Sequence, residues 1–402
     1  MTYRKLRIYY VGMVCTGAYV KAIREDAFVG AASGKMSSVV TALRLAGRRA
    51  VLVSLPFVGK GAGRLPGRLC RGDRFPALFL PVWRSPAVRK VLGTFSLAWF
   101  AIHRVRSRDT ILFYNHGLEY LLALLILRMR GVAVFQDIED VPISTERGLR
   151  GVLNRLGYVL MFKLASARKV TVSNLVGKTL NLSDFLAVQG IAAENVTAVG
   201  QEKWTQLEAG APLRVHYGGT LMASTGLDLF CAAVAQLGAT AEPIGRRIDF
   251  IVTGIGDLKC IHDLIATLRS DWLGIEVHQG VARDVYFDLL DSCHASLSLK
   301  SPESEISSTT FPSKVIEITS RGLALVSTQV SDVGDIFTDN AAWLIQQFSD
   351  QALSDILLNM ARNPAEVRRR ADAGQALARA RFSPPAVGRA LAEFLEEGPK
   401  AR

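Results

Sequence analysis

The chain has 402 residues, a length that suits two domains of roughly 200 residues each. Hydrophobic residues make up 49% of it and charged residues 21%, which excludes a disordered, collagen-like or low-complexity protein. The apolar runs at 91–102 and 120–127 are shorter than the roughly 20 residues that cross a bilayer, so we expect no membrane-spanning helix. The N-terminus lacks a secretory signal and the five cysteines are scattered singly, so we expect a cytoplasmic protein.

The net charge of +12 is unevenly distributed along the sequence. Residues 1–200 hold 29 Lys and Arg against 11 Asp and Glu, a net +18, whereas residues 201–402 hold 19 against 25, a net −6. From Lys60 to Arg108, only Asp73 offsets eleven basic residues. Such a field attracts anionic lipid, nucleic acid or a phosphorylated substrate, although a solvated basic surface on a soluble protein explains it equally well.

The first half alternates short β-rich runs with helical patterns, which predicts parallel strands joined by right-handed crossovers. Strands are expected at 6–11, 50–55, 110–114, 132–136 and 169–172, and helices at 35–46, 118–130 and 154–164. A glycine-rich stretch at 59–67 predicts a loop. After Pro86, apolar residues recur at helical spacing: Val88, Leu92, Phe95, Trp99 and Ile102. We interpret this helix as part of the core; the alternative is an amphipathic helix whose flanking basic residues meet lipid phosphates.

The second half repeats the alternation more clearly, with strands expected at 213–217, 248–252, 275–278, 295–299, 324–327 and 343–345. We therefore expect an α/β fold of two doubly wound lobes that face a central cleft. The first lobe takes residues 1–205 and is completed by a terminal helix at 384–402. The second lobe takes residues 206–383, and an exposed linker is expected at 200–212.

Four loops of the second lobe follow the carboxyl ends of its strands, where doubly wound folds bind ligands. They are Gly218-Gly219-Thr220, 253–256, 280–283 and 301–312. Glycines let backbone amides approach a phosphate, although strand-to-helix turns also use glycine for steric reasons alone. Gly254-x-Gly256 lacks the third glycine of a dinucleotide fingerprint, because Lys259 occupies that position, which disfavours a nicotinamide cofactor.

The segment 309–327 is the most informative part of the sequence. Pro312 suits the start of a helix, so Lys314 and Glu317 lie three residues apart on one helix face. A cation and a carboxylate placed in this way at the mouth of a cleft can hold a diphosphate and a ribose diol. The alternative interpretation is a plain helical ion pair.

Five features in chain order resemble the family four glycosyltransferases. They are the stretch 170–175, the Gly218-Gly219 turn, Gly254-x-Gly256, the Pro-Ser-Lys-x-x-Glu helix from Pro312 to Gly322, and the terminal Arg381-Phe-Ser383. The resemblance covers nearly the whole chain and is strongest at 311–327. It implies two Rossmann-like lobes of the glycosyltransferase type B fold and retaining transfer of a sugar from a nucleotide diphosphate donor.

The resemblance also implies roles for residues of the second lobe. Glu317 matches the glutamate that typically binds the donor ribose. Thr309 stands where a family member usually has a second glutamate that touches the donor sugar, and Glu303 or Glu305 would have to replace it. The remaining expected donor-binding residues are Gly218, Gly219, Gly254, Arg283, Ser313 and Lys314.

A basic pair that the family uses on the diphosphate is missing from this chain. Its positions hold Thr220 and Thr225. The loss removes two charge-assisted contacts, each typically worth about 1.5 to 3 kcal/mol. Lys314, Arg283 or Lys259 would have to neutralise the donor instead, and of these Lys314 is the preferred clamp because it shares a helix with Glu317.

The resemblance assigns the acceptor to the first lobe. The segment 32–37 resembles the family's glycine loop, with Gly34 kept and Lys35 in place of the second glycine, so Gly34 is expected to approach the donor. His116 follows the strand at 110–114, and a cluster of carboxylates, 137–140, follows the next strand. We expect His116, Asp140 and Glu305 to act in catalysis, although a hydrogen-bonded structural histidine explains His116 equally well.

Together these observations predict a retaining hexosyltransferase of polysaccharide biosynthesis, with a nucleotide sugar as donor and a glycan or lipid-linked molecule as acceptor. No cofactor or metal is expected, since basic groups and amides suffice to stabilise a leaving diphosphate. The basic first lobe suits a lipid diphosphate acceptor and peripheral attachment to the anionic inner membrane face. The alternative is a catalytically degenerate protein that binds a nucleotide sugar or a partner. Nucleic-acid binding is not expected, because no recognised module accompanies the charge.

Overall fold

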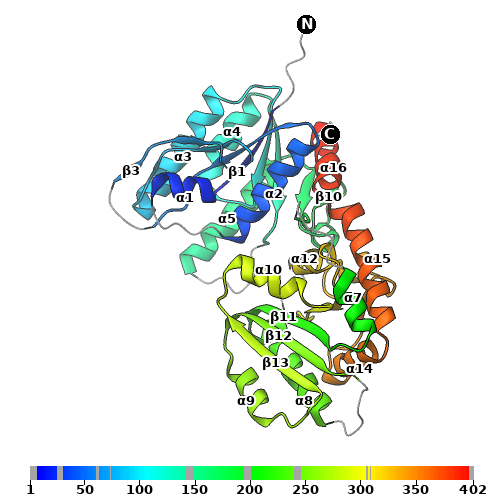
Figure 1. Ribbon diagram of the computed structural model, residues 1–402. Coiled ribbons are helices and arrows are strands. Elements are labelled where there is room, and N and C mark those ends of the chain that lie inside the picture. Colours follow the sequence, from blue (N-terminus) through cyan, green and yellow to red (C-terminus); the bar gives the residue numbers. More distant parts are fainter. Residues whose placement is uncertain are drawn as a thin grey trace. The chain divides into compact units, whose positions relative to one another are not determined.

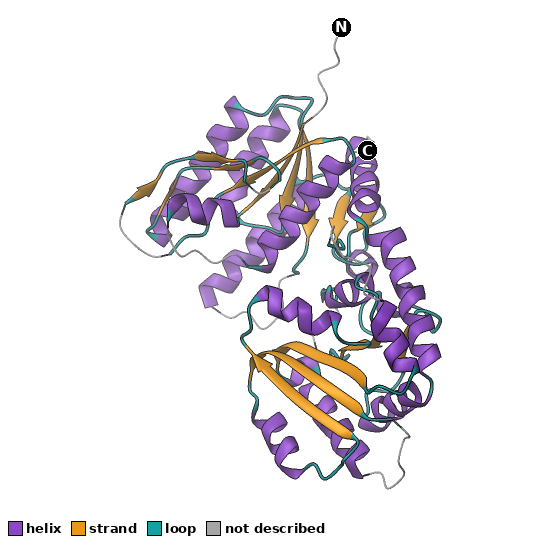
Figure 2. Cartoon of the chain, viewed as in Figure 1, coloured by secondary structure: helices purple, strands orange, loops and turns teal. Residues whose placement is uncertain are grey.

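The computed structural model describes residues 7–24, 30–59, 63–72, 74–141, 148–193, 201–239, 246–304, 307 and 309–397. The chain divides into two compact units (Figure 1). Unit 1 comprises Met1–Ile191 and Ser383–Arg402, and unit 2 comprises Ala192–Phe382. Each unit has its own parallel sheet covered by helices, as Figure 2 shows, so the expected α/β fold of two doubly wound lobes is confirmed.

The sheet of unit 1 has eight strands in the order β10-β9-β8-β7-β1-β2-β5-β4. All neighbours are parallel except β4 and β5. The strands are β1 (Arg7–Gly12), β2 (Arg49–Ser54), β4 (Arg68–Cys70), β5 (Ala77–Phe79), β7 (Thr110–Tyr114), β8 (Ala133–Ile138), β9 (Lys169–Thr171) and β10 (Phe185–Ala187). A separate antiparallel pair joins β3 (Arg64–Leu65) to β6 (Val82–Trp83).

Helices cover both faces of this sheet. On one face α2 (Ala31–Leu45) packs against α16 (Pro384–Glu396), where a Cβ on Gly388 would overlap the carbonyl of Ala42. On the other face α3 (Pro86–His103), α4 (Leu121–Met129) and α5 (Gly148–Leu164) pack in sequence order. Shorter helices are α1 (Gly17–Ile23), η1 (Leu118–Tyr120) and α6 (Asn174–Thr179).

The sheet of unit 2 has six parallel strands in the order β13-β12-β11-β14-β15-β16. They are β11 (Leu213–Leu221), β12 (Ile248–Gly256), β13 (Leu273–Gln279), β14 (Ala295–Ser298), β15 (Ala324–Thr328) and β16 (Ala342–Ile345). Every residue of β14 and β15 is buried, as expected for central strands covered on both faces.

The helices of unit 2 are α7 (Gln201–Glu208), η2 (Ala223–Thr225), α8 (Leu227–Ala239), α9 (Lys259–Thr267), α10 (Arg283–Asp291), α12 (Lys314–Ser320), α13 (Val333–Ile336), α14 (Asp350–Arg362) and α15 (Pro364–Phe382). Figure 1 shows α8 and α9 on one side of the sheet and α10 and α12 on the other. The crossovers therefore diverge between β11 and β14, the two central strands.

Several expectations need correction. The segment 200–212 was expected to be an exposed linker, but its residues 201–208 form α7, whose Trp204 and Leu207 are buried in the core of unit 2. The units consequently divide after Ile191, not near residue 205. The chain then returns to unit 1 at Ser383, because α16 packs on α2.

The helix α3 packs on the core of unit 1, as interpreted from the sequence, but through a different face from the expected one. Its buried side chains are Leu97, Ala98, Phe100 and Ala101, whereas the aromatic residues of the expected core stripe, Phe95 and Trp99, are exposed. The loop expected at 59–67 contains the short strand β3. Among the described residues, no helix combines the length and the apolar character needed to cross a bilayer.

Candidate functional site

The carboxyl ends of β11 and β14 lie at the point where the crossovers of unit 2 diverge. In doubly wound sheets, this switch point is where ligands bind, because the loops on its two sides lead to opposite faces and leave a crevice. Gly218 and Gly219 follow Tyr217, the last residue of β11 that pairs with β14, and Lys300 lies two residues beyond β14. Glycine turns and a cation from separate parts of the sequence are thus brought to one edge.

Two glycines at this edge are required by the backbone. Gly219 has φ +118°, a value that other residues rarely adopt, and it is exposed. Gly254 has φ +150°, and a Cβ there would overlap the carbonyl oxygen of Gly219 on the neighbouring strand. Both glycines therefore have a steric role in letting β11 and β12 run side by side to their ends. The same turns leave the backbone of Gly219 open to a ligand.

Lys314 reaches this edge from the first residue of α12. Its ammonium donates a hydrogen bond to the carbonyl of Gly218, and Nζ would lie 3.1 Å from a Cβ built on Gly219. Burial lowers the pKa of Lys314 to about 8, against the opposing effect of Glu317. No ion pair joins Lys314 to Glu317 in the part of the chain that the structure describes. The plain helical ion pair is therefore not the state of this lysine.

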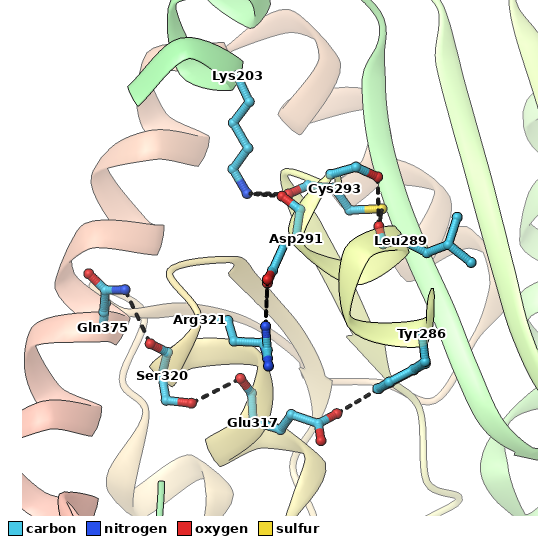
Figure 3. A network of polar contacts seen from close by, with 10 residues as sticks. Lys203, Tyr286, Leu289, Asp291, Cys293, Glu317, Ser320, Arg321 and Gln375 are labelled. Carbon is cyan, nitrogen blue, oxygen red and sulfur yellow. Dashed lines mark hydrogen bonds and ion pairs between the residues drawn. The ribbon is translucent and has the colours of Figure 1, made fainter. Parts of the chain in front are cut away.

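Glu317 lies one turn further along α12 and faces α10. Its Oε1 accepts a hydrogen bond of 2.6 Å from the hydroxyl of Tyr286 (Figure 3). Burial raises the pKa of the Tyr286 hydroxyl well above its usual value, so the phenol stays protonated and donates. The carboxyl group of Glu317 is thus held by one neutral donor, which fixes its position.

His216 lies beneath this cluster as a buried member of β11. Its Nδ1 is 2.8 Å from Ser296 Oγ on β14, and its Nε2 is 2.8 Å from Thr253 Oγ1 on β12. Tyr286 packs edge-on against the imidazole, with ring centroids 5.8 Å apart. Burial, with a contribution from Lys314, lowers the pKa of His216 to about 3, so the ring is neutral. It ties three strands together under the candidate site.

A second polar contact fixes α12 against α10 from its C-terminal end. Arg321 donates two hydrogen bonds from Nη1 to the carboxylate of Asp291, at 2.7 and 2.6 Å, and its guanidinium lies 3.8 Å from the ring centroid of Phe287. Figure 3 shows this pair beside the Tyr286–Glu317 contact. Both contacts join the same two helices, so the position of Glu317 is set by two independent anchors.

The other expected donor-binding residues occupy varied positions. Ser313 is the exposed N-cap residue of α12, and its hydroxyl makes no cap hydrogen bond. Arg283 begins α10, is exposed, and lies 5.4 Å from the ring centroid of Phe287. It precedes Tyr286 by one turn, so it shares a helix face with the residue that contacts Glu317. Lys259 is exposed at the start of α9.

The loop after β14 contributes one cation and holds the two candidate glutamates. Lys300 donates a hydrogen bond of 2.8 Å to Thr310 Oγ1, and burial lowers the pKa of Lys300. Glu303 is exposed in a turn, and Glu305 lies outside the described residues.

Thr225, one of the two threonines in place of a basic pair, donates to the carbonyls of Thr220 and Met222 at 2.6 and 2.8 Å. It builds the turn after β11.

Unit 1 carries an acidic edge at the carboxyl ends of β7 and β8. Asn115 has a left-handed backbone, with φ +56°, and its Oδ1 accepts from the backbone amides of Glu139 and Asp140 at 2.9 and 2.8 Å. Its Nδ2 donates to the carboxylate of Asp140 at 2.8 Å. Asp140 is exposed, so this amide holds a solvent-facing carboxylate in place.

The other carboxylates of this edge have cationic or phenolic partners. Lys35 pairs with Glu139, and its Nζ lies 3.6 Å from Asp137 Oδ1. The hydroxyl of Tyr10 on β1 donates to Asp137, which is buried. Burial lowers the pKa of Lys35, and Asp137 opposes that effect. Lys35 therefore serves the acidic cluster of unit 1.

Gly34 lies in other surroundings than expected, whereas the contacts of His116 match one of the two interpretations of this residue. Gly34 lies in the first turns of α2, not in a loop, and its amide donates to the carbonyl of Gly30 at 3.3 Å. The helix begins earlier than expected because Gly30 acts as its N-cap. His116 Nε2 is 2.8 Å from Asn154 Oδ1, and the ring packs edge-on against Tyr158. These contacts fit a hydrogen-bonded histidine at a strand end.

Four residues of these two edges were missed by sequence reasoning: Tyr286, Lys300, His216 and Asn115. Asn115 and Lys300 follow the carboxyl ends of β7 and β14 within two residues, and this position in the sequence could have identified them as candidates. Tyr286 and His216 become visible only through partners 31 and 80 residues away along the chain. No local pattern signals such pairs.

A family model described as "Glycosyl transferase-like" matches residues 194–393. The fold resembles that of Anabaena HepE solved in complex with UDP, at 12% identity and TM-score 0.65, over 98% of this chain and 100% of that one. Sucrose-phosphate synthase from Thermosynechococcus elongatus aligns at 12% identity and TM-score 0.61, over 98% and 99%.

A third similar structure is the pneumococcal O-GlcNAc transferase GtfA in complex with UDP and GlcNAc, at 9% identity and TM-score 0.60, over 98% of this chain and 99% of that one. No curated protein sequence matches the chain. At these identities the structural likeness concerns the fold, which is the glycosyltransferase type B fold of two doubly wound lobes.

Proposed function

We propose that the chain transfers a hexose from a nucleotide diphosphate sugar to a glycan or lipid-linked acceptor, with retention of anomeric configuration. The match of residues 194–393 to the family model described as "Glycosyl transferase-like" supports this proposal. The observation that carries this proposal is the placement of Lys314 and Glu317. One helix presents an ammonium at the Gly218-Gly219 turn and a fixed carboxylate one turn away, at the switch point of unit 2.

The ammonium of Lys314 suits a diphosphate. A nucleoside diphosphate brings about two negative charges, and backbone amides supply only partial positive charge to balance them. The lysine donates to a backbone carbonyl and has no carboxylate partner among the described residues, so a diphosphate oxygen is a stronger acceptor that it can take instead. The solved HepE structures include complexes with UDP and with UDP-glucose, which supports a donor of this class.

The carboxylate of Glu317 suits a ribose. An ionised carboxylate only accepts hydrogen bonds, and a ribose diol offers two donors in fixed geometry. Tyr286 holds Oε1 from the α10 side, so the carboxylate has a defined orientation before a ligand arrives. Ser313 and the Gly219 and Gly254 turns complete the donor site in this proposal.

For the transfer itself, the proposal places the acceptor on unit 1. The acceptor oxygen forms a bond to the anomeric carbon while the bond from that carbon to the diphosphate breaks, and the acceptor proton passes to a diphosphate oxygen. Asp140 and His116 orient the acceptor hydroxyl, and Glu305 contacts the donor sugar. Lys314 and backbone amides stabilise the leaving diphosphate, so the proposal assigns no step to a metal or cofactor.

A catalytically degenerate protein that binds a nucleotide sugar or a partner is the second candidate. It is favoured by Thr220 and Thr225, which stand in place of a basic pair and which bond to each other within the turn after β11. In that case the nucleotide binds but sugar transfer is absent.

Transfer and hydrolysis assays with a panel of nucleotide sugars separate the two candidates. We expect one donor to be consumed by the wild-type chain and not by Lys314→Met. Lys178→Met is the matched control, since Lys178 is an exposed lysine on α6 of unit 1, and no donor-binding role is proposed for it. Nucleotide binding with no turnover of any donor supports the degenerate protein, and absence of binding contradicts both.

We also propose that the reaction occurs in the cytoplasm, during assembly of a polysaccharide, with no nucleic-acid partner. The basic first half of the sequence fits an anionic acceptor such as a lipid diphosphate. A competition experiment in which RNA or DNA fails to displace the nucleotide sugar, and fails to bind at physiological salt, checks the last part.

A further inference from the structure

The outward face of α3 carries an apolar stripe. Val88, Val91, Phe95, Trp99 and Ile102 recur at helical spacing and are exposed, with Phe95 59% and Trp99 53% accessible. Large aromatic side chains along several turns of one helix face indicate an interaction surface, because contiguous apolar surface is unfavourable in water.

The outward face of α5 repeats the pattern. Leu149, Val152, Leu153, Leu156 and Val159 are exposed at helical spacing, and Leu149 is 74% accessible. The helix α4 lies between α3 and α5 and exposes Leu125 and Met129. Twelve of the twenty large hydrophobic side chains exposed among the described residues are on these three helices, so the apolar surface is concentrated on one side of unit 1.

The same three helices contain no acidic residue. Their cations with described side chains are Arg89, Lys90, Arg128, Arg155 and Lys163, and three further arginines, Arg104, Arg106 and Arg108, follow α3. Within the described part of the chain, Lys90, Arg106, Arg108, Arg155 and Lys163 make no ion pair with a carboxylate. The opposite side of unit 1 differs, since Arg48 on that side pairs with Glu396 of α16.

We propose that α3, α4 and α5 form a docking face for a membrane that contains anionic lipids. Phe95, Trp99 and the aliphatic side chains enter the headgroup region, and the basic residues bind lipid phosphates at the rim. The guanidinium of Arg104 lies 6.0 Å from the ring centroid of Trp99, a pairing that suits an interface with one apolar and one charged side. This inference goes beyond the proposed transfer and does not depend on it.

Charge selects a membrane over the other occupants of an apolar face. A second copy of the chain would bring an equally basic face, and two such faces repel. A nucleic acid would use the cations but leave the two apolar stripes in water. An anionic membrane matches both the charge and the apolar area of the face.

Flotation with vesicles of equal parts phosphatidylcholine and phosphatidylglycerol, and with phosphatidylcholine alone, tests the proposal. We expect the wild-type chain to float with the anionic vesicles and less with the neutral ones. Each exposed cation near such a surface contributes roughly fivefold, so Lys90→Gln/Arg106→Gln/Arg108→Gln weakens binding by about 100-fold. Phe95→Ser/Trp99→Ser also weakens binding, and its loss persists at high salt, where screening removes the charge term.

Matched controls distinguish this face from the overall charge. Arg269→Gln/Arg379→Gln/Arg389→Gln removes the same charge elsewhere, and Leu45→Ser removes a side chain that is 53% exposed on α2, on the other face of the sheet. We expect both controls to bind like the wild type. Failure of the wild type to float at low salt overturns the proposal, as does equal binding by Phe95→Ser/Trp99→Ser.

Sedimentation velocity excludes the remaining occupant. A wild-type dimer that Phe95→Ser/Trp99→Ser converts to a monomer would show that the face is a subunit interface, and this result also overturns the proposal. Transfer to a soluble acceptor is measured in parallel. It is expected to be unchanged in these variants, so loss of docking and loss of sugar transfer are told apart.

Discussion

The two sheets present opposite chemistry at their carboxyl edges. In unit 2 the edge consists of glycine turns, the ammonium of Lys314 and a single fixed carboxylate, Glu317. In unit 1 it consists of Asp137, Glu139 and Asp140, gathered around Asn115 and Lys35. An edge with amides and a cation suits a diphosphate, whereas an edge with carboxylates suits hydroxyl groups. One kind of frame therefore presents two kinds of chemistry, which are set by the residues after its strands.

The two edges also differ in the surroundings of their lysines, Lys35 in unit 1 and Lys314 in unit 2. Lys35 is placed among carboxylates, which stabilise its charge. Lys314 is desolvated without a carboxylate partner among the described residues, and its pKa falls to about 8. A bound anion stabilises the charge of such an unpaired, desolvated cation more than it stabilises a cation that already has a carboxylate partner. This contrast motivates the following predictions.

The largest effect is expected from Lys314→Met. If Lys314 stabilises the charge that develops on the leaving diphosphate, turnover falls by roughly two orders of magnitude or more, with a smaller loss in affinity for the free nucleoside. Steady-state kinetics with the preferred donor measures this, with Lys178→Met on α6 of unit 1 as the control. Turnover within a few-fold of the wild type would show that Lys314 is not the clamp and would make Arg283 the next candidate.

Asp140→Asn should separate the two edges. The amide keeps the hydrogen-bonding shape but loses the charge that orients an acceptor hydroxyl, so transfer falls by about 100-fold. Nucleotide affinity stays unchanged, because Asp140 belongs to unit 1 and the proposed nucleotide contacts belong to unit 2. Calorimetry and transfer assays on the same preparation check both halves of this statement. A parallel loss of nucleotide affinity would contradict the assignment of the nucleotide to unit 2 and of the acceptor to unit 1.

Nucleotide affinity should depend on pH through Lys314. With a pKa of about 8, the free lysine loses its proton between pH 7 and 9, and affinity for a nucleoside diphosphate falls by about tenfold over that interval. Lys314→Arg, which stays charged, removes the decline. The free energy of unfolding of the ligand-free chain has the opposite dependence on pH. The unfolded lysine keeps its proton up to about pH 10.4, so the free energy of unfolding rises between pH 8 and that value. Titrations at fixed ionic strength test the decline, and equal slopes for both chains would refute its assignment to Lys314.

Tyr286→Phe should have the smallest effect. It removes the 2.6 Å hydrogen bond to Glu317 but keeps the ring that packs on His216. Glu317 then loses the hydrogen bond that orients it, so nucleoside affinity falls by about threefold to tenfold. A binding titration of the variant measures this. An affinity that matches the wild type would mean that Arg321 and the packing of α12 hold the carboxylate without the phenol.

Much of the fold could be predicted from the sequence because its signals are local. The strand at Thr110–Tyr114 was predicted with its observed limits, and the alternation of buried strands and helices predicted both sheets. The segment 201–208 could not be placed in this way. Its polar surface suggests a linker, and only the packing of Trp204 and Leu207 on the core of unit 2 makes it a helix of that unit.

The candidate site was predictable to the extent that it lies within one element. Lys314 and Glu317 are three residues apart, so helical spacing places them on one face. The carbonyl that Lys314 contacts is 96 residues away, and the phenol that holds Glu317 is 31 residues away. Such pairs depend on how elements pack. Gly34 was expected in a loop because segment 32–37 resembles the family's glycine loop, but Gly30 caps α2 and places Gly34 in that helix.

The most direct test of the account is a calorimetric titration of UDP and, separately, GDP into the wild-type chain, Glu317→Gln and Asp140→Asn. We expect one nucleotide to bind the wild type and Asp140→Asn equally, and to bind Glu317→Gln at least about tenfold more weakly, because the amide accepts only part of the ribose hydrogen bonding that a carboxylate accepts. Circular dichroism should show that all three chains are folded alike. Equal affinity for the wild type and Glu317→Gln would contradict the assignment of the unit 2 edge to the donor nucleotide.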